Sequence, residues 1–282
     1  MTDLGAYLGT SALVLILCLV PLWLISLKAR DASIIDIFWG FGFVVVACVC
    51  LYLAPVKTDY LILLAALPII WGLRLTLYLA KRNLGHGEDP RYAAMQKRAE
   101  KKGISEAAWR RRALYTIFLG QGFLILLVSA PVWIGFARGF FVDQSSVSIT
   151  TTIGPIALIG TLIWLIGFLF EAIGDWQLAR FLKKNKDYDG PYETKPVLNT
   201  GLWKYTRHPN YFGNAAMWWG IFLVACQAPL GWVSIFAPLI MTILLTRVSG
   251  RDLLERKLKK RPAYKDYVAR TSGFFPWFPK KS

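Results

Sequence analysis

A series of long apolar segments constrains this chain more than any other feature. Hydrophobic residues make up 55% of the 282-residue sequence and charged residues 18%, whereas soluble domains carry about 25% charged residues. An α-helix needs about 20 predominantly apolar residues to cross the hydrocarbon core of a bilayer. The stretches that meet this length are 7–27, 34–54, 60–80, 114–137, 151–176, 209–227 and 230–248. The sequence therefore predicts an all-α integral membrane protein with seven transmembrane helices.

The basic residues predict the orientation of these helices. Of the 33 Lys and Arg residues, 30 lie in the segments 28–33, 81–113 and 177–208 and in the tail from Arg247. Positively charged connections stay on the cytoplasmic side of a membrane. We therefore expect an N-terminus outside, a cytoplasmic C-terminus and an odd number of spans. Five or nine spans remain possible if one boundary is misplaced, above all around 209–248.

The connections on the basic side have a structure of their own. Segment 93–112 is rich in Ala, Lys, Arg and Glu and predicts a surface helix, and 177–208 predicts an ordered, turn-rich loop. The first apolar run has no convincing cleavage site, so we expect a retained helix rather than a signal peptide. We expect a single membrane domain over 1–282, in which 1–150 contributes the substrate side and 151–282 most of the cofactor side.

Ionisable and amide residues inside the spans are the first candidates for a functional site, because they are costly in lipid. Asp36 opens the second span and Arg74 lies in the third. Three helix ends carry polar pairs at a spacing of four residues, which places each pair on one helix face. These pairs are Glu171 with Asp175, Asn210 with Asn214, and Arg247 with Arg251. The alternative for each residue is a helix cap or a side chain that reaches toward the headgroups.

Together the three pairs predict a polar pocket that opens to the cytoplasm. Carboxylates and amides suit ribose hydroxyls, and guanidinium groups bind phosphates through two hydrogen bonds, so a nucleotide fits better than an inorganic ion. No P-loop is present, and Gly40-Phe-Gly42 lacks the rest of a dinucleotide fingerprint. The two histidines, His86 and His208, have no metal-binding partners at a suitable spacing, so we expect no metal.

The most distinctive motif is Gly201-Leu-Trp-Lys-Tyr-Thr-Arg-His-Pro-Asn-Tyr-Phe-Gly-Asn214. It resembles the signature of the steroid 5α-reductase-like membrane superfamily, which also includes sterol reductases and, more distantly, isoprenylcysteine carboxyl methyltransferases. Arg207-His208-Pro209-x-Tyr211-x-Gly213 is common to the reductases and methyltransferases. The patterns Asn210-Tyr211-x-Gly213-Asn214 and Arg247-x-x-x-Arg251-Asp252 resemble the reductases more closely. The resemblance is specific over roughly 160–280 and only suggestive over 30–95.

The resemblance implies a seven-helix bundle with NADPH in a cavity that faces the cytoplasm. Basic groups near the 2′-phosphate would favour NADPH over NADH. The implied contacts of NADPH are Arg74, Glu171, Asp175, Asn210, Asn214, Arg247 and Arg251, with Tyr192, Lys195, Arg207, His208 and Tyr211 as neighbours.

The resemblance also implies hydride transfer to the β-carbon of an α,β-unsaturated ketone, as in a Δ4-3-ketosteroid. In that family a carboxylic acid and a tyrosine polarise the ketone oxygen. Asp36 takes the place of the acid, and we expect a protonated carboxyl there that donates to the developing enolate. Trp71 falls at the position of the tyrosine, so either another tyrosine such as Tyr78 replaces it or the electrophile is built differently. Asp36 could instead be a helix-start residue that faces the interface.

Two alternatives to a reductase remain open. One is an S-adenosylmethionine-dependent methyltransferase of a lipid or prenyl thiol, and the other is a lipid-binding membrane protein or a scaffold with a degenerate cofactor site. For the reductase we expect a hydrophobic, steroid-like enone or other lipid as substrate, membrane lipids as partners, no nucleic acid and a monomer. The location would be a bacterial inner membrane, or the endoplasmic reticulum in a eukaryote.

Overall fold

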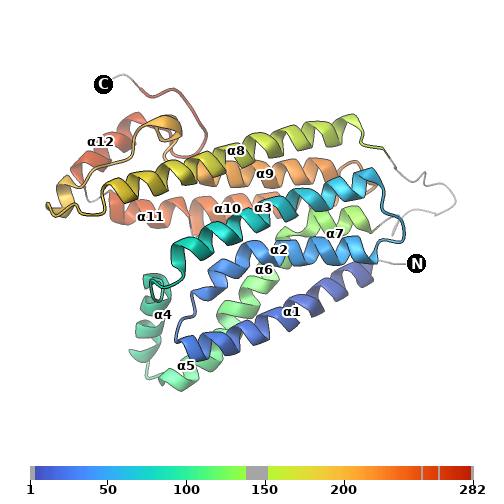
Figure 1. The fold of residues 1–282 in the computed structure, drawn as a ribbon, viewed down its shortest axis with the longest axis horizontal. Coiled ribbons are helices and arrows are strands. Elements are labelled where there is room, and N and C mark those ends of the chain that lie inside the picture. The colour runs from blue at the N-terminus through green and yellow to red at the C-terminus, as the bar shows by residue number, and fades with distance from the viewer. Residues whose placement is uncertain (1–3, 138–151, 249, 260, 281–282) are drawn as a thin grey trace. The chain divides into compact units, whose positions relative to one another are not determined.

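The computed structural model describes residues 4–137, 152–248, 250–259 and 261–280 (Figure 1). Every regular element within these residues is a helix, and the only β-type pairing there is an isolated parallel bridge between Thr206 and Ser272. The chain divides into two compact units. The first unit comprises Met1–Ala157 and Ala225–Ser234, and the second comprises Leu158–Val224 and Ile235–Ser282.

Three long helices open the first unit: α1 (Leu4–Ala29), α2 (Ile34–Leu53) and α3 (Asp59–Asn83). Helices α2 and α3 meet at two glycines. A Cβ on Gly40 would lie 2.6 Å from the carbonyl oxygen of Gly72. The glycines therefore allow main chain to contact main chain, and Gly40 has a packing role in place of a nucleotide-binding one.

The predicted surface helix at 93–112 is in fact two helices, α4 (Pro90–Glu100) and α5 (Glu106–Ala113). Gly103 separates them with a φ of +76°, a conformation that glycine adopts without strain. Asp89 and Ser105 cap the two helices, because their side chains accept hydrogen bonds from the main-chain N–H groups of Arg91 and Ala108. The prediction of a single helix was wrong because it overlooked Gly103, which ends the first helix, and Ser105, which caps the second.

The fourth apolar run does not form one straight helix. Helix α5 continues through the π-helical segment η1 (Leu114–Leu119) into α6 (Gly120–Val128), and α7 (Ala130–Phe136) follows after Ser129. Pro131 lies in the first turn of α7, where the absence of an N–H group costs nothing. The connection at 138–150 lies outside the described residues.

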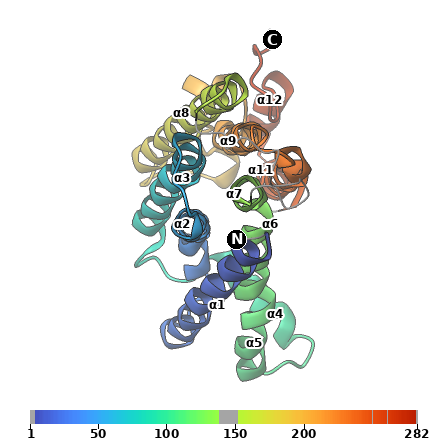
Figure 2. The same ribbon diagram turned by 90° about the vertical axis from the view of Figure 1, so that its right-hand side faces the viewer.

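The second unit is built on α8 (Pro155–Lys184) and α9 (Pro209–Ala225), which lie side by side in Figures 1 and 2. Their glycines repeat every seven residues, at 160, 167 and 174 on α8 and at 213 and 220 on α9. A Cβ on Gly160 would lie 2.6 Å from the carbonyl oxygen of Gly220, and one on Gly167 would lie 2.5 Å from that of Gly213. The two backbones therefore touch along an antiparallel seam, which we call the glycine seam.

The connection from α8 to α9 has the turn-rich character that the sequence predicts. It contains two short 3₁₀ turns, at Tyr192–Thr194 and Gly201–Lys204. Chain after α9 forms the 3₁₀ segment η4 (Gly231–Ile235), α10 (Phe236–Ile243) and the π-helical segment η5 (Leu244–Val248).

The last predicted span ends before Arg251, so it does not include both arginines of its predicted polar pair. Segment η5 ends at Val248, and Arg251 begins a separate helix, α11 (Arg251–Leu258), which is followed by α12 (Pro262–Arg270). Arg247 and Arg251 therefore do not lie on one continuous helix, contrary to our expectation. Gly250 precedes α11, and a Cβ there would collide with the main chain of Leu245.

Six helices in the described part of the chain are long and apolar enough to cross a membrane. They are Leu4–Ala29, Ile34–Leu53, Asp59–Asn83, Glu106–Val128, Pro155–Lys184 and Gly231–Val248. This pattern indicates a multi-pass membrane protein. Helix α9, the counterpart of the predicted span 209–227, has 17 residues.

Candidate functional site

The predicted site residues fall into two groups, one in each unit. Asp36, Trp71, Arg74 and Tyr78 belong to the first unit, and all the other predicted cofactor contacts belong to the second.

In the second unit, the two carboxylate residues of α8, Glu171 and Asp175, lie beside the start of α9. Glu171 and Asp175 are 3% and 4% exposed. The Nδ2 atom of Asn210 donates a hydrogen bond of 3.0 Å to Oδ1 of Asp175. A Cβ on Gly213 would lie 2.5 Å from the main-chain nitrogen of Glu171. Both carboxylates thus lie on the face of α8 that packs against α9, and neither extends toward headgroups.

Asn214 lies one turn after Asn210 and is 8% exposed. Its Oδ1 atom is buried and accepts no hydrogen bond from any residue that the structure describes. A buried acceptor without a donor costs roughly 1–3 kcal/mol. A ligand that brought an amide or hydroxyl donor to this atom would recover that cost.

Arg207 and His208 both bind the carboxylate of Glu255, a partner that the sequence did not predict for them. Arg207 donates to both oxygens of Glu255, with Nε–Oε1 at 2.8 Å and Nη2–Oε2 at 3.2 Å. His208 Nε2 lies 3.0 Å from Oε1, and Lys259 Nζ lies 3.0 Å from Oε2. Glu255 is 2% exposed, so a single buried carboxylate joins α11 to the segment that precedes α9.

These contacts shift the pKa values of Glu255 and His208. Burial acts to raise the pKa of Glu255, but hydrogen bonds from His208, Arg207 and Lys259 outweigh it and hold that pKa well below its usual range. Burial lowers the pKa of His208 more than the carboxylate raises it. A neutral His208 in contact with the carboxylate carries its proton on Nε2, and this N–H group donates a hydrogen bond to Glu255.

Arg207 also holds the C-terminal segment of the chain. Its Nη1 donates to the carbonyls of Val268 and Thr271, and its main-chain N–H donates to Ser272. The neighbouring Thr206 donates through Oγ1 to the carbonyl of Phe274 at 2.8 Å. In this structure the Arg-His pair of the motif connects the chain between α8 and α9 to the tail.

Three further cationic residues of the predicted site, Arg247, Arg251 and Lys195, belong to the second unit. Arg251 Nε contacts Oδ1 of Asp252 at 2.8 Å, and Arg247 Nη1 lies 3.5 Å from Oδ2. The two arginines therefore share one carboxylate even though a helix end separates them. Lys195 is exposed, and Tyr192 lies under the guanidinium of Arg261 at 5.5 Å. The ring of Tyr211 stacks on His208 with centroids 5.3 Å apart.

In the first unit, Asp36 is the centre of a second cluster. Its Oδ2 accepts a hydrogen bond from Nη2 of Arg91, and its Oδ1 accepts one from the phenol of Tyr92, both at 2.6 Å. Gln121 Nε2 donates to the same phenol at 3.0 Å. Both oxygens of Asp36 accept hydrogen bonds, so this side chain can hold the phenol of Tyr92 in position.

Tyr92 is a tyrosine that the sequence did not single out. It is 7% exposed, and burial together with the charge of Asp36 raises the pKa of its phenol. It lies on α4, 56 residues from Asp36, so no local spacing links the two. The available signal was the Asp89-Pro90 start of a helix, which orients the first turn of α4.

The predicted electrophile residues have different surroundings. Trp71 is fully buried and packs against Phe43, with ring centroids 5.3 Å apart. Tyr78 lies between two cations of α3, because Arg74 and Arg82 are 5.3 and 5.8 Å from its ring centroid. The ring of Trp71 therefore contacts α2, and the ring of Tyr78 lies beside cations of its own helix.

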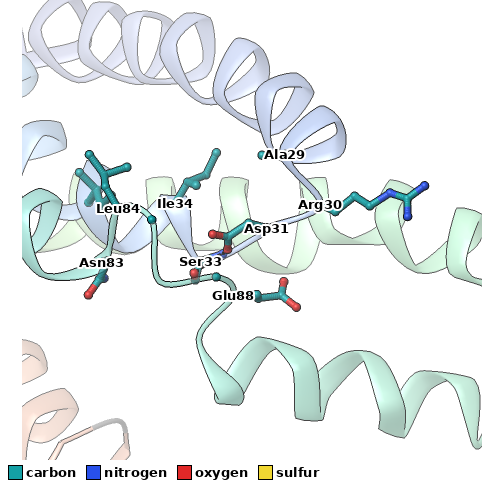
Figure 3. Close-up of a pocket in the computed structure, with 11 residues that line it drawn as sticks. Ala29, Arg30, Asp31, Ser33, Ile34, Asn83, Leu84 and Glu88 are labelled. Carbon is teal, nitrogen blue, oxygen red and sulfur yellow. Dashed lines mark hydrogen bonds between the residues drawn. The ribbon is translucent and has the colours of Figure 1, made fainter. Parts of the chain in front are cut away.

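A cavity of about 320 Å³ lies near the Asp36 cluster, between the turn after α1 and the loop after α3 (Figure 3). Ser33, Ile37 and Glu88 are among its lining residues. Glu88 Oε1 accepts from the N–H of Ala32 at 2.9 Å, and the Arg30 side chain points away from Ser33 and Glu88 in Figure 3. The cavity is at the small end of ligand pockets, which begin at about 300 Å³.

Comparisons with known proteins identify the family but not an activity. An uncharacterized protein of Schizosaccharomyces pombe is 22% identical over an alignment of 294 positions, gaps included, which covers 90% of this chain and 75% of the yeast protein. No solved structure matches the chain significantly. The model of a family described as "Protein of unknown function (DUF1295)" matches residues 22–271. The chain therefore belongs to the DUF1295 family.

Proposed function

We propose that this protein is a membrane-embedded, NADPH-dependent reductase of a C=C bond conjugated to a ketone in a hydrophobic lipid or steroid. The proposal rests on the resemblance of residues 160–280 to the steroid 5α-reductase-like superfamily. Its main structural support is the cluster on the glycine seam, in which Glu171, Asp175 and Asn214 are buried and Asn210 is half-buried.

The residues of this cluster suit NADPH. Carboxylates accept hydrogen bonds from ribose hydroxyls, and the unpaired Oδ1 of Asn214 is an acceptor for an amide or hydroxyl donor. Arg247 and Arg251 supply guanidinium groups at the edge of the same unit, and guanidinium groups bind phosphates well. Arg207 and His208 have a supporting role here, because both already bind Glu255.

Tyr92 takes the role of the tyrosine that is missing at Trp71. The cofactor would supply a hydride to the β-carbon of the enone. Electron density would move to the ketone oxygen, and the Tyr92 phenol would stabilise the enolate by turning its single O–H from Asp36 to that oxygen. Asp36 and Gln121 hold that phenol from two helices. The α-carbon then takes up a proton, which completes the reduction.

The proposed topology has seven spans with the C-terminus in the cytoplasm. Helix α9 would be the additional span, the sixth in chain order, since 17 residues at 1.5 Å each extend about 26 Å, close to the lower limit for a crossing. The basic connections favour this orientation.

Thermal stabilisation of the detergent-purified full-length protein tests the cofactor. At about 100 times its Kd, a ligand that binds only the folded state stabilises it by about 2.7 kcal/mol. We expect NADPH to raise the melting temperature more than NADH or S-adenosylmethionine. Arg251→Ala should weaken the NADPH effect, whereas Arg270→Ala, an exposed residue of α12, should not.

The other outcomes would favour the competing functions. A shift with S-adenosylmethionine and none with NADPH would replace the reductase with a methyltransferase. If none of these ligands raised the melting temperature, the chain would be better described as a lipid-binding membrane protein.

A further inference from the structure

One strongly basic surface takes no part in the clusters described above. It is formed by α4, the turn after it, and α5, all within the first unit. Its exposed cations are Lys97, Arg98, Lys101, Lys102, Arg111 and Arg112. Within the described residues, no hydrogen bond or ion pair occupies any of these six side chains.

The acidic residues nearby are too few to neutralise this surface. Glu100 accepts a hydrogen bond from Gln96, and Glu106 pairs with Arg110. Arg110 is itself tied to α1, because its Nη1 donates to the carbonyl of Leu27 at 3.2 Å. The surface therefore keeps a large positive charge on cations that are free to bind a ligand.

The basic surface is continuous with a candidate membrane span, and this continuity determines its depth in the membrane. Helix α5 runs without interruption into η1 and α6, and Glu106–Val128 is one of the candidate membrane spans. Arg111 and Arg112 precede the first residue of η1 by two or three positions, at about 1.5 Å per residue. They must therefore lie where the span leaves the hydrocarbon core.

The end of a second candidate span, α1, lies beside these arginines. Trp23, in the last turns of the candidate span α1, donates through Nε1 to the carbonyl of Arg110 at 2.9 Å. Tyr115, directly after the arginines, is 68% exposed, and tyrosine is enriched at membrane interfaces. Two spans thus end at the basic surface, at the depth of the lipid headgroups.

We propose that the basic surface on α4 and α5 binds the phosphate headgroups of anionic phospholipids. Basic clusters directly beside a membrane span attract anionic lipids. A nucleic acid would also satisfy the charges, but the continuity of α5 with a span places these cations against headgroups. The inference is independent of the proposed reductase activity.

Native mass spectrometry of the full-length protein tests this surface with phosphatidylglycerol and phosphatidylcholine as probes. We expect phosphatidylglycerol to bind at least tenfold more tightly than phosphatidylcholine. The variant K97Q/R98Q/K101Q/K102Q should lose most of this preference. The matched control K183Q/K184Q/K186Q/K265Q removes four exposed cations of the second unit and should retain it.

Several results would overturn the proposal. Two concern the lipids: an equal affinity of the wild type for both, or an equal loss of the phosphatidylglycerol preference in the two variants. Two concern other anions: displacement of phosphatidylglycerol by millimolar inorganic phosphate, or tighter binding of a short RNA than of phosphatidylglycerol. Circular dichroism of both variants should match that of the wild type. If the first variant does not fold, K101Q/K102Q, in the turn after α4, provides the same comparison against K183Q/K184Q.

Discussion

Arg207 donates hydrogen bonds to both oxygens of Glu255, and this buried pair links the chain before α9 to α11. Removal of one partner from a buried ion pair typically costs about 3–5 kcal/mol, whereas an apolar replacement of both partners is often neutral. We therefore expect Glu255→Met to destabilise the protein by about that amount and Arg207→Met/Glu255→Met to restore only part of the loss, because the carbonyls of Val268 and Thr271 lose their donor. Denaturant unfolding in detergent measures both, and a double variant no more stable than Glu255→Met would contradict this account.

The same carboxylate predicts a pH dependence of stability. The pKa of Glu255 is lower in the folded protein than in the unfolded chain. Its contribution is therefore complete above the unfolded value of about 4.3 and is lost as the pH falls below it. The melting temperature of the wild type should fall on acidification below that pH, and Glu255→Gln should show a smaller fall. Glu193→Gln, an exposed control, should follow the wild type.

Asn214 provides a test in which stability and ligand binding change in opposite directions. Because its buried Oδ1 accepts no hydrogen bond within the described residues, Asn214→Leu removes an unsatisfied group. The ligand-free variant should melt at the same temperature as the wild type or higher, yet bind NADPH at least tenfold more weakly. A lower melting temperature together with unchanged NADPH affinity would show that the acceptor has a partner in the protein.

Tyr92→Phe tests the proposed hydrogen-bond donor to the enolate oxygen. The variant keeps the ring but loses the hydrogen bond to Asp36, and loss of a positioned donor typically slows catalysis by about 10²–10⁴-fold. We expect kcat for enone reduction to fall in that range while the affinity for NADPH is retained. Tyr115→Phe, at an exposed tyrosine, is the control. Asp36→Asn should also slow turnover strongly without loss of NADPH binding, and full activity in either Tyr92→Phe or Asp36→Asn would remove that residue from the mechanism.

The glycine seam predicts a position-specific effect of a single methyl group. Gly167→Ala would place a Cβ 2.5 Å from the carbonyl oxygen of Gly213, so the helices must separate or the variant must misfold. In Gly9→Ala the new methyl group on α1 meets nothing within 4 Å, and alanine is the better helix former by about 1 kcal/mol. Thermal melting should show a clear loss for Gly167→Ala and no loss for Gly9→Ala.

The sequence predicted the long helices well because lipid imposes a simple requirement on them. The span predicted at 34–54 is Ile34–Leu53 in the structure. Interruptions were harder to predict, because the end at Val248 and the restart at Arg251 accompany a close main-chain approach of Gly250 to Leu245 that leaves no room for a side chain. Hydrophobicity alone carries no signal for such a break.

In the candidate site, the sequence likewise predicted which residues share a helix face but not which distant residues they contact. The spacing of Glu171 and Asp175 placed both on one helix face, and the structure turns that face toward α9. The partners of Asp36 and Arg207 could not be found in this way, because Tyr92 and Glu255 are 56 and 48 residues distant. Such pairs are determined by tertiary packing.

The glycine seam also limits how a ligand could reach Asn214. Rotation of side chains can open a binding site, but at the seam the two helices touch through their main chains. No rotamer change can widen such a contact, so α8 and α9 should move together as a fixed wall. The route of entry must then depend on the segments that individual hydrogen bonds hold in place, such as the tail around Ser272 and Phe274.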